Sequence, residues 1–230
     1  MLAAEKRKKE IEKLKEERIN HILACSFFLF SKNGIECMTM NEIASNSEIG
    51  VASLYRYFVT KEDLSIQVAI HAWNTMEKKF EDVFTSEEYK KMTGIKQLET
   101  LLGVFPAAFK ECPEFFKFIY FFDSFMKKES VDQSRLTAYE EKITFVKAIV
   151  IQALNKGLED KTIDFSSLIS SETGVGENVD KVCTAVLHGL FSTAQKLSLS
   201  QGLLAMDEKI QPYEELVLLV KLFVDELSAR

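Results

Sequence analysis

The chain has 230 residues, including 18 Phe but only 3 Pro and 9 Gly, so it can bury a sizeable core and favours long helices over a turn-rich β fold. Its formal net charge is −6, with a net +2 over residues 1–61 and −8 over the remainder. Because DNA repels an acidic surface, a nucleic-acid contact is expected only in the N-terminal quarter.

The cysteines and histidines form no recognisable site. The four cysteines are far apart and lack C-x-x-C spacing, and the three histidines are equally scattered. This pattern excludes a zinc or disulfide framework, and we predict no cofactor and no metal. No apolar run approaches the roughly 18 residues of a membrane span, and the charged N-terminus lacks a signal peptide's apolar stretch. We therefore expect a cytoplasmic protein with no membrane contact.

The first predicted helix covers residues 3–31. Its second half places apolar residues at helical spacing, and Asn33 and Gly34 are residues that commonly end a helix. Its first half, residues 1–17, is a charged extension that begins with Lys6, Arg7, Lys8 and Lys9. Two interpretations stay open, because these cations either reach DNA phosphates or belong to a solvated face of interleaved Glu and Lys.

Two very short helices are predicted between Thr39 and Lys61. Thr39 followed by Glu42 forms a capping box that starts a helix ending near Asn46, and a second helix runs from about residue 50 to residue 58. Thr60 is the expected N-cap of a long amphipathic helix over residues 61–84, with Asp63 in the capping-box position.

The spacing inside this segment favours a helix-turn-helix. Ala44, Ile49 and Leu54 suit the helix crossing, the turn and the anchor of the second helix. The rest of that helix then faces outward, namely Val51, Ala52, Ser53, Tyr55, Arg56 and Tyr57. Exposed tyrosines beside an arginine suit phosphate and base-edge contacts in a major groove. The alternative is a compact three-helix packing unit with no DNA contact.

The segment resembles the DNA-binding domain of the TetR family of bacterial regulators. The matching residues are Thr39, Ile43-Ala44, Leu54-Tyr55-Arg56-Tyr57-Phe58 and Lys61-Glu62-Asp63-Leu64. The resemblance is specific over residues 18–70 and rests beyond them on helix order and length. It implies phosphate contacts by Thr39, Tyr55, Tyr57 and Lys61, and contacts to base edges or adjoining backbone by Asn41, Val51, Ala52, Ser53 and Arg56.

Two positions depart from the family pattern. Glu48 stands where the family often has a turn glycine, which predicts an altered turn because positive φ costs a non-glycine residue about 1 kcal/mol. Gly50 stands where a capping Ser or Thr is common, and it remains a predicted DNA contact.

The remaining helices are expected at residues 95–111, 113–128, 133–158, 178–200 and 212–228, with a mobile connection at 159–178. The predicted fold is all-α with about nine helices. We divide it into a three-helix DNA-binding domain, residues 1–64, and a larger effector-binding and dimerisation domain, residues 65–230.

The resemblance implies that the larger domain encloses an effector pocket. The Phe-rich run at 105–128 suits a small apolar or aromatic ligand. The expected wall and orienting residues are Phe105, Phe109, Phe118, Phe122, Tyr139, Phe145 and His188. Ordinary core packing is the alternative for each aromatic, and a core or interface position is the alternative for His188.

The last two helices predict a homodimer. The final helix is apolar on two sides, and this surface is too wide for a helix that packs against a single partner. In the helix before it, Gly189 allows two backbones to approach closely. Pairing with a symmetry mate would make a four-helix bundle. The expected interface residues are Val182, Val186, Gly189, Leu190, Leu216, Val220, Phe223 and Leu227.

The sequence therefore predicts a TetR-like repressor that binds a two-fold operator as a homodimer and is released by a small, largely apolar effector. It contains no G-x-G-x-x-G, P-loop, G-x-S-x-G or H-E-x-x-H motif, so no enzyme is predicted. The alternative is a helical adaptor of the same fold that acts on a protein partner.

Overall fold

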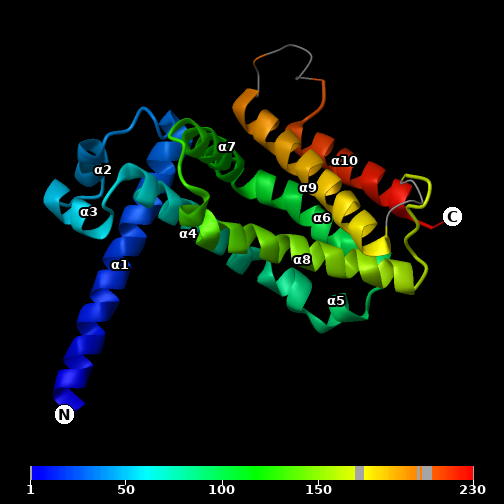
Figure 1. Ribbon diagram of the computed structural model, residues 1–230, viewed down its shortest axis with the longest axis horizontal. Coiled ribbons are helices and arrows are strands. Elements are labelled where there is room, and N and C mark those ends of the chain that lie inside the picture. The colour runs from blue at the N-terminus through cyan, green and yellow to red at the C-terminus, as the bar shows by residue number, and fades with distance from the viewer. Residues whose placement is uncertain (1, 169–173, 201–202, 204–208, 230) are drawn as a thin grey trace. The chain divides into compact units, whose positions relative to one another are not determined.

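The computed structural model describes residues 2–168, 174–200, 203 and 209–229, and these residues form an all-α protein (Figure 1). Within this part of the chain there are ten α-helices, one 3-10 helix and no strand. An isolated antiparallel bridge joins Ile163 to Ser228. The predicted all-α class is confirmed. None of the helices in the described residues combines the length and apolarity needed to cross a bilayer.

The chain divides into two compact units. Unit 1 comprises Met1–Thr75 and Phe118–Tyr139, and unit 2 comprises Met76–Lys117 and Glu140–Arg230. Helices α4, α7 and α8 each contribute residues to both units. Since a segment of α7 and the start of α8 complete unit 1, this unit extends beyond the residues 1–64 that carry the sequence motif.

Unit 1 contains α1 (Leu2–Asn33), α2 (Met40–Asn46), α3 (Val51–Tyr57) and the first part of α4 (Lys61–Thr85). Most of α7 (Pro113–Lys128) and the 3-10 helix η1 (Gln133–Leu136) also belong to it. Its core gathers side chains with no exposed surface from α1, α2, α3 and α4, namely Ile22, Phe30, Ile43, Leu54 and Leu64. Phe118 of α7 joins this core, with its ring 5.3 Å from that of Phe27 and 6.5 Å from that of Phe30.

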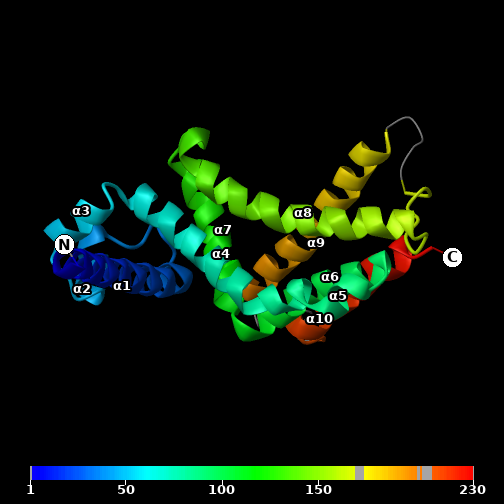
Figure 2. The same cartoon turned by 90° about the horizontal axis from the view of Figure 1, so that it is seen from below.

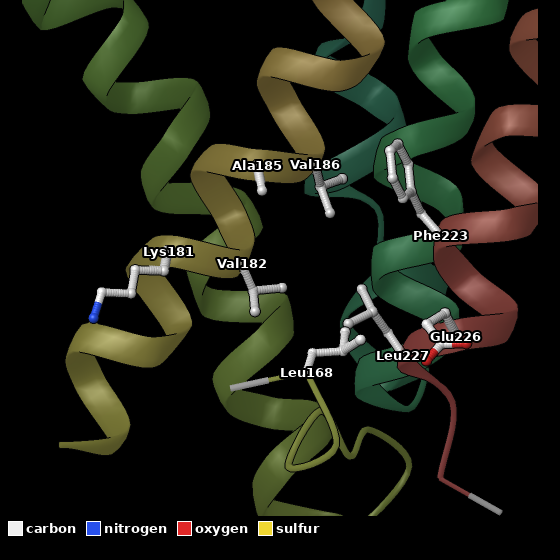
Figure 3. A pocket seen from close by; sticks show the side chains of 8 residues that line it. All are labelled: Leu168, Lys181, Val182, Ala185, Val186, Phe223, Glu226 and Leu227. Atoms are coloured by element: carbon white, nitrogen blue, oxygen red, sulfur yellow. The ribbon is translucent and has the colours of Figure 1, made fainter. Parts of the chain in front are cut away.

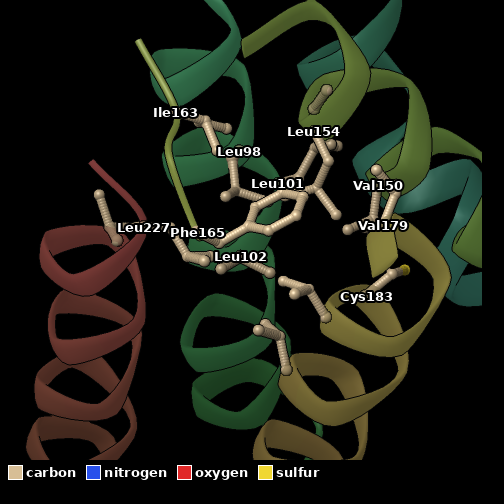
Figure 4. Close-up of a cluster of buried hydrophobic side chains, with 14 of the residues drawn as sticks. Leu98, Leu101, Leu102, Val150, Leu154, Ile163, Phe165, Val179, Cys183 and Leu227 are labelled. Atoms are coloured by element: carbon tan, nitrogen blue, oxygen red, sulfur yellow. The ribbon is translucent and has the colours of Figure 1, made fainter. Parts of the chain in front are cut away.

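Unit 2 contains α5 (Glu87–Lys91), α6 (Gly94–Glu111), α8 (Thr137–Glu159), α9 (Val175–Ser200) and α10 (Pro212–Leu227). Helix α10 lies along α6 and α9 (Figures 1 and 2). The core of the unit is a hydrophobic cluster between these helices (Figure 4), including Leu98, Leu102, Leu154, Val179, Cys183 and Leu227.

Three details differ from the expected helices. Helix α5 was not predicted, and Ser86 caps it by accepting a hydrogen bond from the Tyr89 N–H. The helix expected from residue 133 begins as η1, which Asp132 caps, and continues as α8. Helix α9 begins at Val175, inside the connection predicted for residues 159–178, of which residues 169–173 lie outside the described part.

A glycine contact fixes the approach of α6 to α8. A Cβ at Gly94 would overlap the backbone N and Cα of Gly157. The same end of α6 is held by the Gly94 N–H, which donates to Asp160 Oδ2 at 2.8 Å, and the Ile95 N–H, which donates to Thr162 Oγ1 at 3.1 Å. Backbone atoms cannot move aside as a flexible side chain can, so only glycine fits.

We predict that Gly94→Ala lowers the free energy of unfolding by about 3 kcal/mol, as expected for severe overpacking. Gly103→Ala is the matched control on the same helix, because nothing lies within 4 Å of its Cβ position. This control should raise stability by about 0.5–1 kcal/mol through helix propensity. Urea unfolding of both variants measures the difference, and equal stabilities would contradict the packing described.

Candidate nucleic-acid interface

Helix α2 starts at the capping box that the sequence predicts. Thr39 Oγ1 accepts a hydrogen bond from the Glu42 N–H at 3.2 Å, and the Thr39 N–H donates to Glu42 Oε2 at 2.8 Å. The hydroxyl of Thr39 donates to the same carboxylate at 2.7 Å. The bonds from the hydroxyl and then the backbone of Thr39 lower the pKa of Glu42. Thr39 is thereby held at the exposed start of α2, next to the exposed Asn41.

The turn between α2 and α3 keeps the left-handed conformation of a glycine, although Glu48 in place of glycine predicted an altered turn. Glu48 has φ 55°, and the following Ile49 N–H donates to Ala44 O at 3.0 Å. Ala44 is buried and Ile49 is half-buried, as expected for the crossing and turn positions of a helix-turn-helix. Glu48 therefore occupies a backbone conformation that favours glycine.

Helix α3 presents one face to the core and the other to solvent. Leu54 is fully buried and anchors the helix, whereas Tyr55 is 48% exposed. Of the other predicted contacts, Gly50, Val51, Ala52 and Arg56 are exposed, and Ser53 and Tyr57 are half-buried. The Arg56 guanidinium lies 5.8 Å from the centre of the Tyr57 ring. Polar, aromatic and cationic groups thus share a narrow outward surface on a helix that fits a major groove.

Residues 22–68 match the family model for bacterial regulatory proteins of the tetR family. The matched residues include α2, α3 and the start of α4. Over these residues the chain is therefore similar to the helix-turn-helix, DNA-binding domain of TetR-family transcriptional regulators. No curated protein matches the chain.

Solved structures of TetR-family regulators share the fold over nearly the whole chain. A TetR regulator from Haloarcula marismortui ATCC 43049 has a TM-score of 0.67 at 13% identity, with 93% of this chain and 99% of that chain covered. The ketosteroid regulator KstR2 of Mycobacterium tuberculosis has a TM-score of 0.62 at 14% identity, with 93% and 96% covered. FadR of Bacillus subtilis, solved with stearoyl-CoA, has a TM-score of 0.62 at 14% identity, with 90% and 98% covered.

The TetR motif also includes the start of α4, where a second capping box forms. The Thr60 N–H donates to Asp63 Oδ2, and the Asp63 N–H donates to Thr60 Oγ1, both at 3.2 Å. Arg135 of η1 adds an ion pair of 2.7 Å to Asp63 Oδ1. Burial opposes ionisation of Asp63, but the bonds from Arg135 and Thr60 outweigh it and lower its pKa.

The side chain of Lys61 makes contacts within the protein that the sequence motif did not reveal. Its Nζ donates to the carbonyl oxygens of Ile35, Glu36 and Met38 at 3.1, 3.4 and 3.2 Å. It also lies 5.0 Å from the centre of the Phe125 ring. The ammonium group therefore holds the segment between α1 and α2, while the phosphate contact predicted for Lys61 stays a prediction.

The seven predicted effector residues do not form one cluster. Phe118, Phe122 and Tyr139 are buried in unit 1, where the rings of Phe122 and Tyr139 lie 4.7 Å apart. Burial raises the pKa of the Tyr139 hydroxyl. In unit 2, Phe109 is buried and Phe105 is half-buried, whereas Phe145 and His188 are exposed.

The predicted dimer residues lie largely inside unit 2. Leu190 and Leu216 have no exposed surface, and Val220 is buried near them. Gly189 is half-buried, and its Cβ position is 3.0 Å from Phe223 Cζ of the same chain. The close approach expected at Gly189 therefore occurs within the subunit, between α9 and α10.

The other four predicted dimer residues border an open groove between α9 and α10 (Figure 3). Its volume is about 490 Å³, and its lining is mainly apolar. Val182, Val186, Phe223 and Leu227 come from the two helices, with Lys181 and Glu226 among the other lining residues. Outside the groove, the exposed apolar side chains of α10 include Val217, Leu218 and Leu222.

The strained turn gives a direct test of the helix-turn-helix geometry. Glu48→Gly should raise the free energy of unfolding by about 1 kcal/mol, because glycine adopts positive φ without a Cβ clash. Glu48→Gln is the control, since it removes the charge and keeps the Cβ. Both variants should bind DNA more tightly than the parent chain because an anion is lost. Thermal unfolding that finds no stability difference between Gly and Gln would contradict the turn conformation.

Proposed function

We propose that this protein is a TetR-family repressor that binds a two-fold operator as a homodimer. The observation that carries the proposal is the outward face of α3, where Tyr55 and Arg56 are exposed while Leu54 anchors the helix. We assign Tyr55, Tyr57 and the Thr39 cap to phosphates, and Ser53 and Arg56 to base edges. Asn41, Gly50, Val51 and Ala52 complete the contact surface. Repression follows when the operator overlaps a promoter.

A dimer supplies the specificity that one recognition helix lacks. Helix α3 has 7 residues and reaches only a few base pairs. A two-fold dimer places two such helices on half-sites one helical turn or more apart. Operator symmetry would then mirror the symmetry of the protein.

The dimer contact is proposed on the side of α9 and α10 that unit 2 leaves open. Leu218 and Leu222 of α10 are 50% and 58% exposed and, four positions apart, form an apolar ridge. The groove lined by Val182, Val186 and Phe223 lies on the same pair of helices. In an isologous contact each subunit offers both ridge and groove, so the two surfaces can bury one another. Leu190, Leu216 and Val220 would then support this interface from inside the subunit.

The double substitution Leu218→Glu with Leu222→Glu should convert the dimer into monomers, because two buried carboxylates on each side would lack partners. Ile143→Glu is the matched control, as Ile143 is an exposed apolar residue of α8 in the same unit. Sedimentation velocity should find monomers for the double variant and dimers for the control. A double variant that sediments as the parent dimer would refute this interface.

The proposed effector is a small, largely apolar molecule that acts through unit 2. Support comes from the aromatic cluster in which the Phe191 ring lies 6.1 Å from Phe105, 6.3 Å from Phe115 and 5.4 Å from Phe116. The FadR structure with stearoyl-CoA adds a relative that holds a ligand with a long apolar chain. Of the seven effector residues predicted from the sequence, we propose Phe105 and Phe109 as the main contacts at this cluster. The other five remain secondary candidates.

Release from DNA is proposed to pass through α4, which has residues in both units. An effector that displaces one end of this helix would alter the spacing of the two recognition helices in the dimer. The protein has one conformation whose helix spacing fits the operator and another whose spacing does not. The effector lowers operator affinity only to the extent that it binds the second conformation more tightly than the first. No catalytic step enters this mechanism.

Mobility shift with a random duplex library, at low and moderate salt, tests DNA binding and selects the operator. Tyr55→Ala should weaken all complexes about equally, whereas Arg56→Ala should alter base preference at one position by about 1–3 kcal/mol. Tyr120→Ala is the control, since Tyr120 is a comparably exposed tyrosine on α7. Absence of retarded DNA at every salt concentration would favour the adaptor alternative.

The selected complexes then allow the effector to be sought. Adding fatty acyl thioesters, steroids and aromatic amphiphiles should release DNA with at least one class of compound. A ligand that saturates the protein and leaves operator affinity unchanged would contradict coupling through α4.

A further inference from the structure

The first half of α1 is a second charged surface of unit 1. Every residue from Glu5 to Arg18 is exposed, so these residues contribute nothing to the core of the unit. At the α-helical rise, this half extends for about 20 Å. Figure 1 shows it as a continuous rod that runs from the packed part of α1 to the N-terminus.

The packed half of α1 fixes which way the exposed half faces. Cys25 Sγ donates to Asn46 O of α2 at 3.6 Å, and the adjoining Ile22 and Ser26 have no exposed surface. Residues three and four positions apart share one face of a helix. Continuing from Cys25 and Ile22 toward the N-terminus, this face carries Arg18, Lys15, Leu14, Ile11, Lys8 and Arg7. We name these six residues the α2-side face.

The charges of the exposed half are sorted by face. The α2-side face contains four cations and no carboxylate. Glu5, Glu12 and Glu16 instead continue the adjacent face, where Phe27 and Phe30 contact Phe118 of α7. Glu5, Glu10 and Glu12 lie three or four positions from cations of this face, but within residues 5–18 the ion pair that forms is Lys13–Glu17, at 3.7 Å. The α2-side face is thus a cationic strip with its carboxylates on the adjoining faces.

The four cations of this face therefore lie on the side of α1 that faces the helix-turn-helix. Their neighbours Ile11 and Leu14 are 59% and 61% exposed, although they lie between charged side chains. Arginine donates two parallel hydrogen bonds to a phosphate, and lysine neutralises one as a point charge. Aliphatic side chains between such groups can pack on the deoxyribose rings that separate phosphates.

We infer that the α2-side face binds the phosphate backbone of DNA beside the bases contacted by α3. The inference rests on the proposed DNA-binding function and extends its surface to Arg7, Lys8, Lys15 and Arg18. This contact is independent of base sequence, so it strengthens binding to any duplex and lengthens the site protected by each subunit.

Two triple variants with the same loss of charge test the inference. The first is Arg7→Gln, Lys15→Gln and Arg18→Gln on the α2-side face. The second, a matched control, is Lys6→Gln, Lys9→Gln and Lys13→Gln on the other sides of the same exposed half. Fluorescence anisotropy with a labelled random duplex gives the affinity of the full-length chains at several salt concentrations. Circular dichroism checks that both variants keep the helix.

Each lost phosphate contact lowers the slope of log K against log salt concentration by about 0.9. We expect the slope of the α2-side variant to fall by about 2–3 per subunit, because up to three phosphate contacts are lost. Its affinity at low salt should fall by about tenfold or more for the same reason. The control should lose less than about 1 from the slope. Equal slopes for the two variants would overturn the inference while leaving DNA binding by α3 intact.

Two other outcomes separate the remaining possibilities. If the parent chain binds no duplex at any salt concentration, the proposed function fails and this inference fails with it. If the α2-side variant keeps the parent slope but changes the sedimentation coefficient, the face binds a second copy of the chain and the inference is wrong.

Discussion

The ammonium group of Lys61 is the interaction on which the DNA-binding surface depends. It binds three carbonyl oxygens of the segment that connects α1 to α2, and the ring of Phe125 lies beside it. This segment leads directly into Thr39, which caps α2. One charged donor at the start of α4 thus connects α1, α2 and α7 around the helix-turn-helix. The Arg135–Asp63 ion pair supports the same end of α4.

Local signals in the sequence predicted most of this arrangement. Thr39 with Glu42 and Thr60 with Asp63 predicted two helix starts, and both capping boxes are present. The residue at the turn position, Glu48, does have positive φ. These signals are readable because each capping box spans four residues and the turn is short. The position of Lys61 was not readable, since Phe125 and the carbonyl groups of residues 35–38 reach it only through tertiary structure.

The C-terminal helices illustrate a different limit of sequence reasoning. The two apolar sides of α10 were evident, but periodicity cannot say which side contacts the same chain. The structure buries Leu216, Val220 and Leu227 within unit 2 and leaves Leu218 and Leu222 exposed. Similarly, the Phe-rich run looked like one pocket wall, yet α7 divides it between two units. Helical spacing therefore predicted how much apolar surface each helix has better than it predicted what packs against that surface.

Unit 1 combines three surfaces of different chemical specificity. In the proposed complex, α3 reads base edges, Thr39 and Tyr55 contact phosphates, and the α2-side face of α1 adds cations that bind independently of sequence. The acidic remainder of the chain disfavours other orientations on DNA. Unit 2 shares α4 with this unit and holds the aromatic cluster, so one continuous helix joins the proposed effector site to the proposed DNA-binding surface.

Site-specific photocrosslinking tests the central claim, that the outward face of α3 contacts DNA. A benzophenone amino acid would replace Tyr55 in one variant and Tyr120 in another. These residues are 48% and 45% exposed, and both belong to unit 1. We predict that irradiation with duplex DNA gives a covalent complex from position 55 and none from position 120. Equal crosslinking at the two positions, or none at position 55 under binding conditions, would contradict the account.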